Sequence, residues 1–150
     1  MPRCAAPNLS VESARRRLSP DARMIGDRLR RTSGLEFPLS PAGDVLAAHE
    51  LATWLLGSSG APGPVARDSR LLLTASLLHL QGRADRPPAV RDLLELLAGF
   101  ASGVCAAGVF AASPMQFLQF AGAEFEMLDP PDLLAALRLS LMTVACVMSR

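Results

Sequence analysis

A twelve-residue stretch, Ser69-Arg-Leu-Leu-Leu-Thr-Ala-Ser-Leu-Leu-His-Leu80, constrains the fold of this chain more than any other feature. On a helix its apolar side chains point in almost every direction. The polar side chains form only a narrow stripe, made of Arg70 and Thr74 within the stretch and Arg67 and Gln81 just outside it. A short helix that is apolar nearly all round is stable only where other elements surround it. The sequence therefore predicts a helix over about 66–80 at the centre of a bundle.

A second helix is predicted soon after the first. Gly82 is expected to end the first helix in a left-handed conformation, and the segment 83–88 contains two prolines that mark a turn. Beyond the turn, apolar residues recur at the i, i+3, i+4 and i+7 positions of one helix face, with polar residues on the other side. The apolar positions are Val90, Leu93, Leu94 and Leu97.

Other stretches extend the helical pattern. Ser40-Pro41 and the segment 129–132 have the composition of helix starts, and Ser113 has capping-box spacing to Gln116. We expect the helix after Ser40 to end at Leu56, before a flexible linker over 57–64, with Trp54 as a core anchor. No stretch alternates apolar and polar residues with the period of a strand. The predicted fold is all-α, a compact bundle of about five to six helices over 37–150, preceded by an Arg-rich arm, 1–36, that is partly disordered or helical.

The basic residues exclude some functions and are unevenly distributed. The chain has no lysine, so it cannot house a Walker A loop or a Schiff-base nucleophile. Its net charge of +1 makes no general case for nucleic acid. Residues 1–31 nevertheless hold eight arginines against three acidic residues. Arg16, Arg23 and Arg30 would share one helix face, which is either an ordinary solvated face or a nucleic-acid stripe.

No motif indicates catalysis, a metal or a cofactor. The three cysteines, Cys4, Cys105 and Cys146, lack the spacing of zinc ligands. Glu124 and Glu126 would point to different sides of a helix, so they cannot form a local acid–base pair. We predict a protein that is not an enzyme and has no cofactor. An enzymatic alternative would require a pocket that brings one of the two histidines, His49 and His79, within hydrogen-bond reach of a carboxylate.

The segment from Leu96 to Ala123 has no charged residue, and Gly99 and Gly103 form a GxxxG pair. Its length suits a membrane span, but its many Ala, Gly and Ser residues and Pro114 do not. A small membrane-associated helical protein, anchored through Leu96–Ala112, is the alternative that this run leaves open.

Ser69–Leu80 and the following Ala89-Val-Arg-Asp-Leu-Leu94 resemble part of the helical domain of TraG/TraD-type coupling proteins of conjugation and type IV secretion. Leu46–Leu56 is similar to the helix that precedes this pair in the family, and Leu133–Leu141 to a later one. The resemblance covers about 37–144. Two features depart from the family: no nucleotide-binding motor is present, and the first 36 residues match nothing in it.

The resemblance implies a non-catalytic helical module that recognises cargo, either a relaxase–DNA complex or an effector protein. Coupling ATPase subunits are further implied partners, and direct contact with nucleic acid is left open. The predicted location is the cytoplasm; a position at the inner-membrane face is left open, with the membrane reached only through a partner. We take four arginines around the central helix and its turn as candidates for the cargo- or DNA-facing surface, with simple solvation as the alternative: Arg67, Arg70, Arg83 and Arg86.

Overall fold

Six α-helices and no β-strand make up the part of the chain that the computed structural model describes, residues 45–57, 63–83 and 88–148. The prediction of an all-α fold is confirmed there, whereas the Arg-rich arm, 1–36, lies outside the described residues. The helices are α3 (Val45–Leu56), α4 (Gly63–Arg83), α5 (Val90–Ala101), α6 (Ala106–Ala111), α7 (Gln116–Met127) and α8 (Pro130–Met148).

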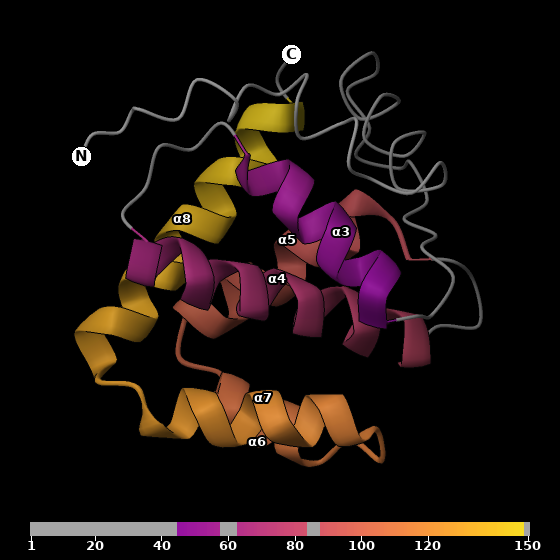
Figure 1. Ribbon diagram of the computed structural model, residues 1–150, viewed down its shortest axis with the longest axis vertical. Helices are drawn as coiled ribbons and strands as arrows, with labels where there is room; N and C mark the ends of the chain where they lie inside the picture. The colour runs from indigo at the N-terminus through magenta and orange to yellow at the C-terminus, as the bar shows by residue number, and fades with distance from the viewer. Residues whose placement is uncertain (1–44, 58–62, 84–87, 149–150) are drawn as a thin grey trace.

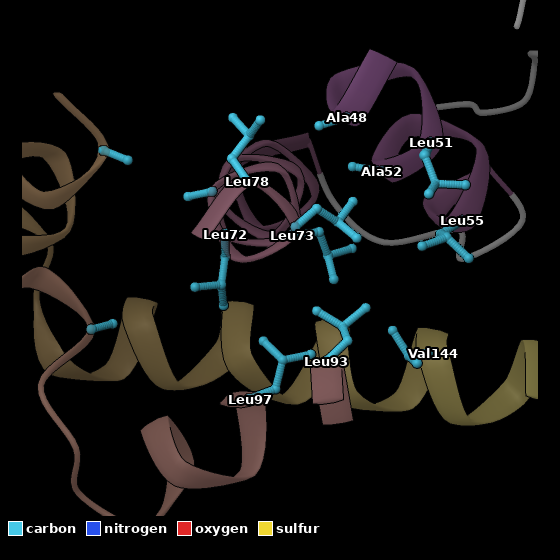
Figure 2. Packing of buried hydrophobic residues seen from close by; sticks show 14 of the residues in the cluster. Ala48, Leu51, Ala52, Leu55, Leu72, Leu73, Leu78, Leu93, Leu97 and Val144 are labelled. Carbon is cyan, nitrogen blue, oxygen red and sulfur yellow. The ribbon is translucent and has the colours of Figure 1, made fainter. Parts of the chain in front are cut away.

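Helix α4 lies at the centre, as its sequence predicts. It crosses the middle of the molecule and contacts α3, α5, α7 and α8 (Figure 1). Figure 2 shows α4 nearly end-on, with its leucines on different sides of the helix. Leu73 points toward α3 and α5, whereas Leu72 and Leu78 point in two other directions, away from each other. All three are buried. Burying a leucine side chain contributes roughly 1.5–3 kcal/mol, so neighbours on several sides are what make this helix stable.

Both ends of α4 extend beyond the predicted bounds. Gly63 and Pro64, expected to belong to a linker, form the first turn, where a proline costs no hydrogen bond because the first N–H groups of a helix have no partner in the helix. The expectation that Gly82 ends the helix is wrong. The helix continues to Arg83, and the only positive φ among the described residues is at Gly103.

Helix α5 follows its predicted pattern. Val90, Leu93 and Leu97 are buried, whereas Leu94 is half-buried. The backbone N–H of Ala89 donates to the Asp92 carboxylate at 2.7 Å, so an acidic residue in the first turn fixes the helix start. We call α3, α4, α5 and α8 the helical body.

The uncharged run after Leu96 is not one helix. Leu97 and Phe100 are buried in α5, the chain then turns at Gly103, which has a φ of 120°, and Phe110 of α6 is fully buried. In the part of the chain that the structure describes, no helix is both long enough and apolar enough to cross a membrane.

Helices α6 and α7 form a hairpin, which we call the α6–α7 hairpin, along one edge of the molecule (Figure 1). Gly122 of α7 lies so close to α6 that a Cβ atom would come within 2.8 Å of the Ala107 carbonyl oxygen and the Ala111 nitrogen. The predicted capping box at Ser113 does not form. The N-cap is Met115, and the Ser113 hydroxyl instead accepts a hydrogen bond from the Met115 N–H at 3.1 Å.

Helix α8 starts at Pro130 as predicted and packs against α4. Leu137 and Val144 are buried, whereas Leu134 is exposed. Two fully buried hydroxyls join α8 to α4: the Oγ atoms of Ser69 and Ser140 are 2.6 Å apart. Ser140 also donates to the Ala136 carbonyl at 2.8 Å, so Ser69 is the donor in the pair.

Candidate functional site

A groove lies between α4 and α7, with His49 of α3 at its side. Its volume is about 340 Å³, near the lower end of the roughly 300–1,000 Å³ that ligand pockets occupy. We call it the α4–α7 groove. It is lined by His49, Arg67, Asp68, Arg70, Leu71, Thr74, Phe117, Phe120, Glu124, Phe125 and Leu128.

The polar stripe of α4 forms one wall of this groove. Arg67 and Arg70 lie one turn apart, so both guanidinium groups reach the same face of the helix. The Arg67 side chain is 76% exposed, and its Nε is 3.7 Å from the Asp68 carboxylate, so this ion pair holds the arginine only weakly. The Thr74 hydroxyl donates to the Arg70 carbonyl at 2.7 Å, so its hydrogen is used within the helix.

Arg70 differs from Arg67 in its surroundings. Its side chain is half-buried, and its Nε is shielded from solvent without a hydrogen-bond partner among the described residues. A buried donor that has no acceptor costs about 1–3 kcal/mol. Arg70 is therefore a positive charge held in the groove with hydrogen-bonding capacity to spare.

The four candidate arginines do not form one cluster. Arg67 and Arg70 line the groove, but Arg83 is thirteen residues beyond Arg70 on the same helix. At a rise of about 1.5 Å per residue their backbones are roughly 20 Å apart. The Arg83 side chain and the whole of Arg86 lie outside the described residues. The groove thus brings together two of the four predicted residues.

Helix α7 supplies an aromatic wall that was not among the predicted site residues. The rings of Phe117 and Phe120 are 6.2 Å apart, and Phe120 is 54% exposed, whereas Phe125 is buried. The signal was present in the sequence. Leu118, Ala121 and Phe125 define the inner face of α7, so Phe120 falls on a different face, where a large apolar side chain remains exposed.

His49 is the titratable group most affected by the groove. Burial lowers the pKa of its imidazole below the usual 6.5, and the positive charge of Arg70 lowers it further, while the negative charge of Glu50 acts in the opposite direction. The imidazole is therefore predominantly neutral at pH 7. With His49 neutral, the two arginines of the groove are balanced by Asp68 and Glu124.

The enzymatic alternative required a histidine within hydrogen-bond reach of a carboxylate. In the described part of the chain, no hydrogen bond joins the His49 imidazole to a carboxylate. His79 lines a second hollow, between the end of α4 and the turn of the hairpin, and none of the residues that line this hollow is acidic.

No group of three or more potential metal-ligating side chains occurs in residues 45–57, 63–83 and 88–148, and Cys105 and Cys146 are free, exposed thiols.

The groove combines two arginines and Asp68 on the α4 wall with aromatic rings and Glu124 on the α7 wall. Aromatic residues and arginine are the side chains enriched where proteins bind one another. No family model, curated protein or solved structure matches this chain.

Proposed function

We propose that this chain is a non-catalytic helical module of the coupling-protein type, which binds a protein cargo such as a relaxase–DNA complex or a secreted effector. One observation supports this proposal above the others: Arg67 and Arg70 of α4 lie beside the phenylalanines of α7 in the α4–α7 groove. This places two of the arginines that we took as cargo-facing next to apolar surface.

The outer face of α7 continues that apolar surface. Phe120 is 54% exposed and Met127 is 82% exposed. They are seven residues apart, about two helical turns, so they lie on the same side of α7. Aromatic residues and methionine flanked by arginine have the composition of the centre of a protein interface.

Most of the residues that carry the family resemblance stabilise the fold and do not form the proposed contact with cargo. Most of the Ser69–Leu80 stretch is buried, as are Val90 and Leu93 in the second matched stretch. Their role is to position α4 and α5 in the body. The contact with cargo is therefore assigned to the groove, which borders this core.

The direct partner is a protein rather than DNA. The two acidic side chains that line the groove, Asp68 and Glu124, offset its two arginines. Binding to a phosphate backbone is driven by several cations that together displace counterions, and a groove with balanced charge lacks that driving force. In a relaxase–DNA cargo, the surface contacted would be that of the relaxase.

The proposal is tested by reversing the charge of the four candidate arginines, Arg67, Arg70, Arg83 and Arg86, to glutamate in the full chain. We expect at least tenfold less of a conjugative relaxase or type IV effector in a pull-down, with an unchanged thermal unfolding midpoint. The matched control reverses Arg91 and Arg138, which are exposed on α5 and α8. Equal capture by the charge-reversed and control variants would reject the cargo-binding role.

A further inference from the structure

The α4–α7 groove has two chemically different walls, and together they restrict what it can bind. The α4 wall presents the Arg70 guanidinium, and the α7 wall presents Phe117 and Phe120. A ligand that uses both walls must carry an anionic oxygen and a large apolar group close together. Neither a purely apolar helix nor a bare anion would do so.

Arg70 calls for an anion that accepts hydrogen bonds. Its side chain is half-buried and lines the groove, and no described carboxylate forms an ion pair with it. The carboxylate nearest in sequence, Asp68, pairs with Arg67. A planar carboxylate suits a guanidinium because two parallel hydrogen bonds can form, and these charge-assisted bonds are stronger than neutral ones.

Phe120 provides the apolar half of the site. Its ring is more than half exposed and tilts against the ring of Phe117, so an incoming side chain would find apolar surface without displacing a core residue. An aromatic ring placed there can pack edge-to-face or offset, as aromatic pairs prefer. At about 340 Å³ the groove is small, which favours one large side chain with its neighbouring polar group over a whole helix.

We propose that the α4–α7 groove binds a partner segment in which an aspartate or glutamate side chain neighbours a large, preferably aromatic, apolar side chain. The carboxylate contacts Arg70 and the apolar side chain lies against Phe117 and Phe120. This inference deepens the proposed function and rests on it for one point, that the partner is a protein. The ligand chemistry itself follows from the groove.

The test titrates the isotope-labelled full chain with a blocked dipeptide, N-acetyl-aspartyl-phenylalaninamide, and follows backbone amide signals by NMR. We expect saturable shifts confined to α4 residues 67–74 and α7 residues 117–128, with a dissociation constant in the millimolar range, as is usual for so small a ligand. The asparaginyl dipeptide, which differs only in lacking the charge, should bind about tenfold more weakly because it loses the charge-assisted pair.

Two variants test the contribution of each wall of the groove to binding. R70M keeps an unbranched apolar side chain but removes the charged guanidinium, and it should weaken binding of the aspartyl dipeptide about tenfold while leaving the asparaginyl dipeptide much less affected. F120A removes an exposed ring and should weaken both dipeptides. R138M changes an arginine on α8 outside the groove and should bind like the wild type. Because F120A alters an exposed side chain, it keeps the test valid should R70M fold poorly.

Equal affinity for the aspartyl and asparaginyl dipeptides, or shifts elsewhere on the chain, would overturn the inference. So would a single-stranded oligonucleotide that shifts the same groove signals more strongly than the dipeptide. If relaxase or effector capture persists but the dipeptide causes no shifts of the groove signals, the ligand assignment fails and the proposed function stands. If the dipeptide binds as described but no cargo is captured, the ligand assignment stands and the proposed function fails.

Discussion

The helical body and the α6–α7 hairpin are held together by different side chains. The body packs leucine against leucine and alanine, with α4 in the middle (Figure 2). The hairpin instead depends on small residues that let α6 and α7 approach closely, and its ring Phe110 packs against aromatic rings of the body. The groove lies where the two regions meet, so the position of the hairpin determines whether Phe120 faces Arg70.

Phe110 is the strongest test of this difference. It is fully buried and contacts His79 of α4 at 6.0 Å, Phe100 of α5 at 5.5 Å and Phe125 of α7 at 5.9 Å between ring centroids. We expect F110A to lower the free energy of unfolding by about 3–5 kcal/mol, because it removes a buried ring and leaves a cavity. Urea denaturation measures the loss.

Hydrogen exchange on the same variant locates the damage. Amides of α6 and α7 should lose protection before those of α4, since Phe110 belongs to the hairpin and α4 keeps its packing against α3 and α8. F120A is the matched control: it truncates an exposed phenylalanine of the same hairpin and should change stability by no more than about 0.5 kcal/mol. Uniform loss of protection across α4 and α7 would show that body and hairpin unfold as one unit.

Gly122 tests the close approach within the hairpin. A Cβ at this position would clash with backbone atoms of Ala107 and Ala111, which cannot move away as a flexible side chain could. We expect G122A to destabilise the protein by about 1–3 kcal/mol despite the better helix propensity of alanine.

G108A is the control in the facing helix. There a Cβ would meet only the Cys105 side chain, at 3.6 Å or more. This substitution should leave the thermal unfolding midpoint unchanged or raise it slightly, because alanine favours a helix by about 0.5–1 kcal/mol over glycine. Equal effects of G122A and G108A would contradict the close packing of α6 on α7.

The Ser69–Ser140 pair tests a buried polar contact that joins α4 to α8 inside the body. S140A leaves the buried Ser69 hydroxyl without its acceptor and should cost about 1–3 kcal/mol. S69A should cost less, near 1 kcal/mol, because Ser140 still donates to the Ala136 carbonyl. In a double-mutant cycle from urea denaturation, the double alanine variant should lose less stability than the two single losses combined. Strict additivity would show that the two hydroxyls do not interact.

His49 gives the smallest effect, and it is located at the boundary of the two regions. Its pKa in the folded protein lies below 6.5, so as the pH falls through 6.5 the unfolded chain takes up the proton first and the free energy of unfolding decreases. The decrease ends once the pH is below the folded-state pKa. The charged groups that line the groove with it are Arg67, Arg70, Asp68 and Glu124, and Glu50 is its neighbour in α3.

The measurement compares urea denaturation of the wild type and H49Q at about pH 7.5 and about pH 5, on either side of the ordinary histidine pKa. The wild type should lose slightly more stability on acidification than H49Q, and the difference isolates this residue from the carboxylates that titrate in both proteins. An equal loss in the two proteins would mean that the groove does not perturb the imidazole.

The body was more predictable than the hairpin for a physical reason. In α5 the buried positions Val90, Leu93 and Leu97 repeat with the helical period, so the pattern and the core coincide. In the hairpin, Gly122 looks like an unfavourable helix residue until its contact with α6 is known. Gly82 was predicted to end α4, but the helix continues through it to Arg83. A glycine that ends a helix usually has a positive φ, and Gly82 does not.

The sequence by itself determined that the described part of the chain is helical and that α4 lies at its centre, because both follow from the periodicity of apolar residues within single helices. It also supplied Arg67 and Arg70 as candidates for a binding surface. Only the tertiary structure decided that these arginines face Phe117 and Phe120, which are about fifty residues away along the chain, and that Arg83 does not join them. Which faces of distant helices meet depends on how the helices cross and on close contacts such as that at Gly122, and no local pattern encodes these.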